Sequence, residues 1–379
     1  MRKMRMTVSR ATLVALCVLI SGCASTPSSA RDPARPASGA GQGAAGKTVP
    51  GKASAGAYDP EPSWVANPRN AFPEERYVSA VGYGENREAA EKSAMGALVA
   101  VFGQTVKGET TVSSRYLEAV KSGALEVSES TDVGRAVTSS FALETVVGAE
   151  IKGVWDDRSR TVYAVAVMDR MKASMLYADL IESNESSIRS LTSIPDSERN
   201  TMEAYARYDL AAEIAETSGR FLNVLSVVNP GAAAARRGTT TRAEDLRVVA
   251  LKIAQTIPIA VSIRDDRDGR IAAAFSAVLT AAGFMTGGSG SRYSLSGSLA
   301  LSPVELPDNP NKFARYTVDA TLRDAVTGNA LLPYSVSGRD GHTSQSEAEN
   351  RAVRAAERKI RGDFGTAFTG FVSGLGGKK

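Results

Sequence analysis

Tyr293-Ser-Leu-Ser-Gly-Ser-Leu-Ala-Leu301 and Ala314-Arg-Tyr-Thr-Val-Asp-Ala-Thr-Leu-Arg-Asp324 are the stretches that decide the fold of the carboxy-terminal part. Apolar and polar side chains alternate along both, which is the period of a strand with one buried face. A strand over 259–263 and a helix over 271–282 are expected before them. A third strand over 330–337 and a helix over 346–371 are expected after them. The pattern predicts an α/β module over residues 258–379.

A second module is expected over residues 61–172. Tyr77–Gly84 has strand composition, and Asn86 can cap the Ala-rich helix that follows. Alternating segments over 105–116, 139–155 and 160–168 come next. The last two are separated by the turn-rich tetrapeptide 156–159 and therefore predict a hairpin.

Residues 173–257 carry helical spacing and little strand signal. Three helices are expected: one near 171–191, one after Asp196 and Ser197, and one capped near Thr241. We expect a break between helices over 229–238. The predicted fold class is α+β: two small α/β modules with mixed or antiparallel sheets, joined by a helical middle region.

The first 22 residues have the composition of a signal peptide. Arg2, Lys3, Arg5 and Arg10 precede an apolar run, Ala11–Ile20, which is about ten residues long. A membrane-spanning helix needs about 20 apolar residues. The run is therefore interpreted as the core of a secretory signal rather than a transmembrane anchor.

The residues after this run resemble the bacterial lipobox. An aliphatic pair and two small residues precede a cysteine whose thiol accepts the diacylglyceryl group; they are Leu19, Ile20, Ser21, Gly22 and Cys23. Diacylglycerol and an amino-terminal acyl chain such as palmitate would hold the protein firmly, since one chain alone binds marginally. Cys17 is a small hydrophobe within the signal core.

The segment over 23–60 is interpreted as the lipidated cysteine and a disordered tether. Ala, Gly, Ser, Thr and Pro dominate it, so it cannot bury enough apolar surface to fold. As a flexible coil it spans about 30 to 35 Å. Ala24 and Ser25 include no Asp, which by resemblance to the common lipoprotein sorting pattern favours the outer membrane.

Charge and composition exclude several classes of protein. The chain has 45 Lys plus Arg and 41 Asp plus Glu, and four of the bases lie in the leader. The remainder is balanced, so no nucleic-acid footprint is expected. With one His and no Cys beyond residue 23, a Cys/His zinc site and a disulfide framework are excluded.

The first module resembles a known family. Its landmarks are Pro62-Ser-Trp-Val65, Tyr77-x-x-Ala-x-Gly-x-Gly84, an Ala-rich helix ending in Val-Phe-Gly-Gln104, and Val162-Tyr-Ala-Val-Ala-Val-Met-Asp-Arg170. These resemble the LPP-twenty family of bacterial outer-membrane lipoproteins and are similar to the amino-terminal domain of the flagellar protein FlgT. The resemblance implies an envelope location and a binding or scaffolding role, with no catalytic residues to carry over.

The carboxy-terminal module resembles the α/β module of the TolB amino-terminal part, LpoB and CsgG. The landmarks are a helix ending in Gly283-Phe284, then Tyr293-x-Leu-x-Gly-Ser-Leu299, then Leu322-x-Asp-x-x-Thr-Gly328. This resemblance implies a protein-docking module in the periplasm and supplies no catalytic set.

Three short motifs allow a ligand interpretation beside a structural one. Gly82-Tyr-Gly84 lacks the third glycine of a dinucleotide loop, so we favour a tight strand-to-helix turn that uses glycine for backbone freedom. Asp156-Asp157 is interpreted as a solvated turn rather than a carboxylate couple. The acidic run 265–270 is assigned to a helix amino-terminus, because the register of a calcium loop fails.

Three further features are weighed in the same way. Tyr205 and Tyr208 are assigned to a packing face, with a peptide or glycan groove as the alternative. Core packing is favoured over membrane contact for Phe364, Phe368, Phe371 and Leu375. His342 is placed in a polar turn that enters the final helix.

The expected function is that of a non-catalytic, lipid-anchored envelope protein with a protein-binding or scaffolding role. No nucleophile–base pair, Walker loop or metal set is recognised, so no catalytic residue, cofactor or metal ligand is assigned. The periplasmic face of the outer membrane is preferred to the cell surface. Alternatives are an activator of a peptidoglycan synthase (a penicillin-binding protein), a flagellar ring component, and a carboxylate-based envelope hydrolase.

Overall fold

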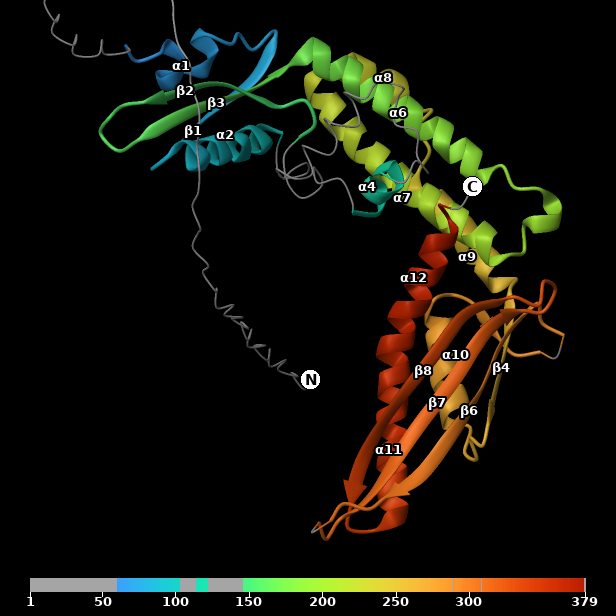
Figure 1. Cartoon of the computed structure of the whole chain (residues 1–379). Coiled ribbons are helices and arrows are strands. Elements are labelled where there is room, and N and C mark those ends of the chain that lie inside the picture. The colour runs from blue at the N-terminus through green and yellow to red at the C-terminus, as the bar shows by residue number, and fades with distance from the viewer. Residues whose placement is uncertain (1–59, 103–113, 122–145, 289, 308, 378–379) are drawn as a thin grey trace, which may run out of the picture. The chain divides into compact units, whose positions relative to one another are not determined.

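The computed structural model describes residues 60–102, 114–121, 146–288, 290–307 and 309–377 (Figure 1). Residues 59–379 cluster into one compact unit. Its described part contains a three-stranded sheet, a five-stranded sheet and a helical middle region. The predicted α+β class is confirmed. No helix in these described ranges combines the length and apolarity that crossing a bilayer requires.

The first sheet is antiparallel, in the order β1-β3-β2, with helix α2 packed on one face (Figure 1). The predicted hairpin is confirmed as β2 and β3. The Asn86 side chain caps α2 by accepting a hydrogen bond from the Ala89 N–H at 2.9 Å. The elements are α1 (Ser63–Ala66), η1 (Pro68–Asn70), β1 (Tyr77–Gly84), α2 (Arg87–Val101), α4 (Ser114–Lys121), β2 (Glu150–Asp156) and β3 (Val162–Asp169).

Two predicted strand segments of this module differ from the structure. Residues 114–116 lie in helix α4 rather than in a strand, while 105–113 lie outside the described residues. Burial of Tyr116 explains the helix, because its hydroxyl donates to Asn184 Oδ1 at 2.8 Å and tertiary packing overrides local propensity. Strand β2 begins only at Glu150, after a turn in which Gly148 has φ +87°.

The explanation given for Gly82 and Gly84 was wrong. Both residues lie within β1 rather than in the turn after it, and neither has a positive φ. A Cβ on Gly82 would lie 2.0 Å from the Ala94 backbone nitrogen, and one on Gly84 would lie 2.6 Å from the Ala89 Cβ. The glycines therefore allow helix and sheet to touch backbone to backbone.

The middle region is helical, as predicted, with two corrections. The helix expected to be capped near Thr241 begins at Ala243 without a side-chain cap, because the Thr241 hydroxyl donates to Glu185 Oε2 at 2.6 Å. The expected break over 229–238 contains an eight-residue helix, α8. Pro230 occupies its first position, and the Asn229 side chain accepts from the Ala232 N–H at 3.1 Å, so turn-forming residues here start a helix. The elements are α6 (Arg170–Thr192), η2 (Asp196–Glu198), α7 (Met202–Val228), α8 (Pro230–Arg237) and α9 (Ala243–Gln255).

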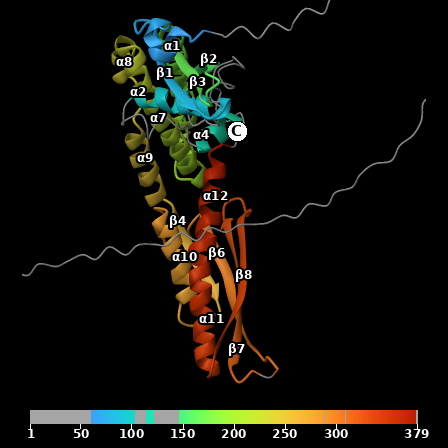
Figure 2. The ribbon, with the colours of Figure 1, turned by 90° about the vertical axis from the view of Figure 1, so that its left-hand side faces the viewer.

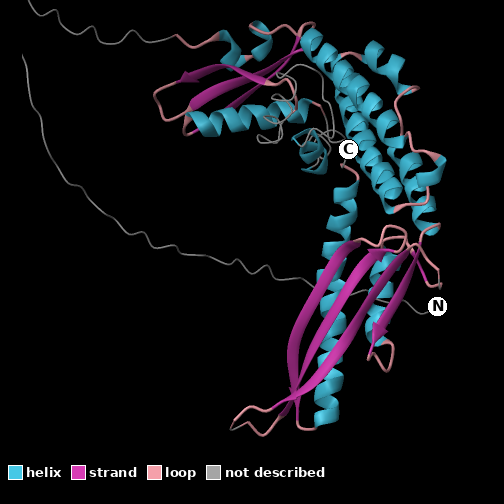
Figure 3. Ribbon diagram, turned by 45° about the vertical axis from the view of Figure 1, so that its right-hand side comes forward, coloured by secondary structure: helices cyan, strands magenta, loops and turns pink. Residues whose placement is uncertain are grey.

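The second sheet is mixed, in the order β5-β4-β6-β7-β8. Strand β4 pairs in parallel with β5 and β6, and the remaining pairs are antiparallel. Helices α10 and α11 share one face of it (Figures 2 and 3). The elements are β4 (Pro258–Arg264), α10 (Arg270–Ala281), β5 (Met285–Thr286), β6 (Tyr293–Val304), β7 (Lys312–Asp324), β8 (Ala330–His342), α11 (Gln345–Lys359), the π-helical η3 (Ile360–Phe364) and α12 (Gly365–Leu375).

The final strand and helix are longer than predicted. Strand β8 continues to His342, because its partner β7 is 13 residues long and pairs along its full length. The short strand β5 was not predicted. Phe364 and Phe368 are buried, which confirms core packing for the aromatic end of the last helix.

Candidate functional site

The predicted lipidation site lies outside the described residues. Cys23, the lipobox residues Leu19, Ile20, Ser21 and Gly22, and the tether up to residue 59 all precede the first described residue. Their roles stay predictions from the sequence.

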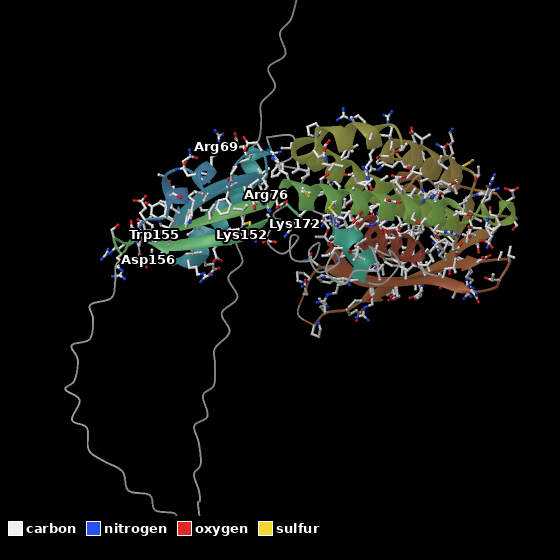
Figure 4. The ribbon with its side chains drawn as sticks, turned by 90° about the horizontal axis from the view of Figure 1, so that it is seen from above. Arg69, Arg76, Lys152, Trp155, Asp156 and Lys172 are labelled. Atoms are coloured by element: carbon white, nitrogen blue, oxygen red, sulfur yellow. The ribbon has the colours of Figure 1, made fainter. Side chains whose placement is uncertain are left out.

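The face of the first sheet opposite α2 is the best candidate. Val78, Ala80 and Gly82 of β1 point toward α2 and are buried. Because side chains alternate along a strand, Tyr77 and Tyr83 must lie on the opposite face. Figure 4 looks down on this side of the sheet.

Three aromatic side chains, one from each strand, form a row across this face. Tyr83 of β1 lies directly opposite Tyr163 of β3, and Tyr163 lies opposite Trp155 of β2. The ring centroids are 6.5 Å apart for Tyr83 and Tyr163, and 5.6 Å apart for Trp155 and Tyr163. Tyr83 is 67% exposed. We call Tyr83, Tyr163 and Trp155 the aromatic row.

Trp64 of α1 borders the aromatic row. Its ring lies over Gly153, two residues before Trp155 on β2, where a Cβ would come within 3.2 to 3.3 Å of three ring atoms. Glycine at this position makes room for the indole. Both tryptophans of the chain therefore lie on this one face of the sheet.

Ion pairs occupy the other end of the same face. Arg69 bonds Glu74 at 2.6 Å, Arg76 bonds Asp169 at 3.5 Å, and Lys152 bonds Glu150. Lys172, at the start of α6, is labelled next to Arg76 in Figure 4. We call Arg69–Glu74, Arg76–Asp169 and Lys152–Glu150 the ion-pair belt.

The pKa shifts in the belt follow from these pairs. The bonded carboxylate of Glu150 raises the pKa of Lys152. Backbone N–H groups of Lys172 and Met171, which donate to Asp169 Oδ1 at 3.1 and 3.0 Å, lower the pKa of Asp169 with help from Arg76. Both shifts favour the charged forms of Lys152 and Asp169.

The Asp156-Asp157 pair forms the predicted turn at the hairpin tip. Asp156 Oδ1 accepts from the Arg158 N–H at 2.8 Å, and Asp157 Oδ1 accepts from the N–H groups of Ser159 and Thr161 at 2.7 and 3.1 Å. The bond from Ser159 lowers the pKa of Asp157. Both carboxylates are used to order the turn, which agrees with the structural interpretation of this pair.

The other predicted candidates occupy separate places. His342 ends strand β8 rather than lying in a turn, and its Nδ1 accepts from the Ser344 N–H at 3.3 Å. In the acidic run 265–270, Asp266 Oδ2 accepts from the Ala272 N–H at 2.8 Å at the start of α10, as a helix amino-terminus requires.

Tyr205 and Tyr208 pack rather than line an open groove. The Tyr205 ring contacts that of Phe284, with centroids 5.0 Å apart, and Tyr208 is half-buried. Phe364 and Phe368 stack with centroids 5.9 Å apart. The packing interpretation is therefore confirmed for these side chains.

An open cavity of about 550 Å³ lies between α7 and the α8–α9 connection. Its main charged group is Glu216, which bonds Arg220 at 2.7 Å and also bonds Arg247. Arg247 lowers the pKa of Glu216. The carboxylate is therefore held as an ion-pair partner rather than as a proton acceptor for chemistry. Across the described ranges, no three His, Cys, Asp or Glu side chains gather as a metal site would require.

Sequence reasoning did not find the aromatic row. Tyr83 follows the buried Gly82, so the alternation along β1 could have placed it on the face opposite the core, but Val154 and Val162 before Trp155 and Tyr163 give no such signal. Only the pairing register brings the three rings together.

No family model matches the chain, and none of the curated proteins matches it. Among solved structures, a candidate lipoprotein from Caulobacter crescentus CB15 is 23% identical, with a TM-score of 0.24, over 30% of this chain and 90% of that one. A minor lipoprotein from Acinetobacter baumannii is 18% identical, with a TM-score of 0.22, over 31% and 91%. A secreted protein from Helicobacter pylori is 11% identical, with a TM-score of 0.38, over 75% and 97%. No function is inferred from these similarities.

Proposed function

We propose that this chain is a lipid-anchored, non-catalytic protein of the bacterial cell envelope that binds other envelope proteins. The observation that carries the proposal is the leader. A basic start, an apolar core of about ten residues and the box Leu19-Ile-Ser-Gly-Cys23 occur in the order that lipoprotein processing requires.

The folded unit supports a binding role rather than a reaction. Aromatic side chains are enriched at protein interfaces, and the aromatic row presents the exposed ring of Tyr83 beside the half-buried rings of Tyr163 and Trp155. The acidic groups analysed above are engaged in ion pairs or turns. We assign the protein to the outer membrane on the basis of Ala24 and Ser25 after the cysteine, and we prefer the periplasmic face to the cell surface.

The anchor is tested with a Cys23→Ala variant of the full chain and a matched Cys17→Ala control. Wild type and the control are expected in the membrane fraction, and the Cys23→Ala variant is expected to leave it. Mass spectrometry of the mature amino-terminus should find acyl chains on Cys23. An unmodified amino-terminus, or membrane retention of the Cys23→Ala variant, would contradict the proposal.

A second candidate is an activator of a peptidoglycan synthase. It is favoured by the order β4-α10-β5-β6-β7-β8-α11, which apart from the two-residue strand β5 agrees with the strand and helix order of the module that the carboxy-terminal sequence resembles. Capture of penicillin-binding proteins by the anchored full chain, lost when residues 258–379 are deleted, would support it. A clean negative in that capture would remove it. In either case a His342→Ala variant should keep its function, whereas a hydrolase that uses this residue would lose it.

A further inference from the structure

We propose that strand β8 pairs with β8 of a second copy of this chain, so that the second sheets of the two copies join into one continuous sheet about a twofold axis at Ser337. The inference goes beyond the proposed function, because that function names no contact between copies. It depends on the described residues of the second sheet and not on the lipid anchor.

Strand β8 lies at an edge of the second sheet. It is 13 residues long and comes last in the strand order, so among the described strands only β7 pairs with it (Figure 1). An edge strand presents N–H and C=O groups that no neighbouring strand satisfies, and these groups can bond another extended chain. The ligand that suits this edge is therefore a β-strand.

Pro333 and Gly341 show which residues of β8 point their backbone groups away from β7. In an antiparallel pair, residues alternate between bonding the neighbouring strand and pointing away from it. Pro333 has no N–H for the ladder, and the Gly341 N–H donates to Asp340 Oδ1 at 2.8 Å instead. The register with β7 is unbroken between them. The outward residues between them are therefore Ser335, Ser337 and Arg339.

Both ends of this outward row are closed to a further strand. Pro333 lacks a donor, and the Gly341 carbonyl accepts a hydrogen bond from Arg351 Nη1 at 3.4 Å, while its N–H is held by Asp340. The backbone groups left for pairing are thus confined to the three residues between the closed ends. Ser337 is the middle of these three, so the usable edge is symmetric about it.

This symmetry matches a second copy in one register. With the two Ser337 residues opposite each other, Ser335 faces Arg339 of the second copy on both sides of the axis, and each pair can exchange two N–H···O bonds. Pro333 then faces Gly341 of the second copy, whose backbone groups are already bonded. Any shifted register brings a closed residue opposite a free one and leaves an N–H or C=O group unpaired, which costs free energy.

Charge favours a second copy over an unrelated strand. Arg315 of β7 lies directly opposite Arg339 on the exposed face, and no ion pair joins either guanidinium to a carboxylate of the described residues. Like charges in this position are destabilising. Ser335 Oγ donates to Asp319 Oδ1 at 2.6 Å. Pairing at Ser337 brings Arg339 of the second copy beside Ser335 and within reach of Asp319, so each copy supplies the acid that the other copy's arginine lacks.

Disulfide crosslinking tests the register. The background is the full chain with Cys17→Ala and Cys23→Ala in detergent micelles, so that an introduced thiol is the only one. In a Ser337→Cys variant the two Cα atoms would face each other at about 5.5 Å, a distance that a disulfide spans. Ser335→Cys is the matched control on the same face of the same strand, because its symmetry mate would lie more than about 13 Å away.

We expect mild oxidation to convert the Ser337→Cys variant into a covalent dimer and to leave the Ser335→Cys variant monomeric in denaturing electrophoresis. A mixture of the Ser335→Cys and Arg339→Cys variants should form a mixed disulfide, because these positions face each other across the axis. Equal crosslinking of Ser335→Cys alone and Ser337→Cys would overturn the inference.

Charge reversal tests the contact between Arg339 and Asp319. Arg339→Asp should raise the Kd of the dimer about tenfold in sedimentation experiments, because the change sets like charges together twice about the axis. Adding Asp319→Arg to the same chain should return Kd to within about threefold of wild type. Arg323→Asp is the matched control, since Arg323 is exposed on the same face but pairs near the far end of β7. It should dimerise like wild type.

Other results would also overturn the inference. These are a wild-type chain that stays monomeric when concentrated, a double charge reversal that does not restore Kd, or crosslinking of Ser337→Cys in cells to a different protein in place of a second copy. Membrane fractionation of Cys23→Ala tests the anchor alone. Because the crosslinking background already lacks Cys23, failure of the dimer and failure of the anchor are distinguishable.

Discussion

The two sheets of this protein are each covered by long helices on one face, and the opposite faces differ in chemistry. In the first sheet the opposite face carries Tyr83, Tyr163 and Trp155, with Trp64 of α1 packed over Gly153 beside them. In the second sheet the corresponding positions are mostly small hydroxyl side chains and charges; they include Ser296, Thr317, Thr321, Ser335 and Ser337, with Arg315, Asp319 and Arg323 among them.

The difference lies in how much apolar area each of these faces carries. Hydroxyl groups on the second sheet bond to neighbours or to water, as Ser335 Oγ does to Asp319 Oδ1 at 2.6 Å. Burying that face against a partner would remove little apolar area from water and would therefore contribute little free energy of binding. The aromatic row keeps apolar area exposed, and burying such area is favourable. The two sheets therefore share an arrangement with helices on one face, and they differ in the side chains on the other face.

The largest expected effect on the free energy of unfolding comes from removing a buried side chain between the second sheet and its helices. Phe364 is fully buried under the second sheet, with its ring centroid 4.8 Å from that of Phe275 and 5.3 Å from that of Tyr334. Phe364→Ala should lower the free energy of unfolding by about 3–5 kcal/mol, because it opens a cavity. Urea denaturation followed by circular dichroism measures it. A loss below about 1 kcal/mol would mean that the site is not packed as described.

A substitution at Gly82 tests the helix-covered face of the first sheet by adding atoms to a close contact, whereas Phe364→Ala removes them. Gly82→Ala should cost about 1–3 kcal/mol, because the new Cβ would meet the Ala94 backbone at 2.0 Å. Gly96→Ala in α2 is the matched control, since nothing lies within 4 Å of its Cβ position. It should gain up to about 1 kcal/mol from helix propensity. Equal effects of the two changes in the same urea experiment would refute the close contact of β1 with α2.

Asp169 joins the ion-pair belt to the start of α6. Asp169→Ala should cost about 0.5–2 kcal/mol through loss of the cap. Its pKa in the folded state is lowered below the ordinary aspartate value. The carboxylate therefore stabilises fully above that ordinary value, and the contribution disappears as the pH falls through the folded pKa.

The difference in unfolding free energy between wild type and Asp169→Ala should accordingly be constant from about pH 6 upward and shrink below about pH 4. Thermal unfolding at several pH values measures it. A difference that grows on acidification would show that Asp169 does not act as a charged cap.

The smallest effects on the free energy of unfolding are expected for substitutions of exposed side chains on the sheet faces opposite the long helices. Tyr83→Ala and Ser337→Ala should each change the free energy of unfolding by no more than about 0.5 kcal/mol, because both side chains are exposed. Urea denaturation measures both changes. A loss above about 1 kcal/mol in either variant would show that its side chain is part of the packed core.

Local patterns predicted much of this fold. The strand alternation over 293–301 and 314–324, the cap at Asn86 and the hairpin turn over 156–159 depend on neighbouring residues, and the structure has them all. The predictions were wrong where contacts with distant parts of the chain decide the secondary structure of a segment. Tyr116 became helical through a buried bond to Asn184, and α8 formed where turn residues predicted a break.

The candidate sites divide in the same way. Amino-acid order alone determined the charge balance of the chain, and it is the sole basis for predicting the leader, the lipobox at Cys23 and the tether, because those predictions depend on local composition. Only the tertiary structure decided that Tyr83, Tyr163 and Trp155 form one row. A strand's period assigns each ring to a face, but which strands pair, and in which register, is set by the packing of the whole sheet against α2.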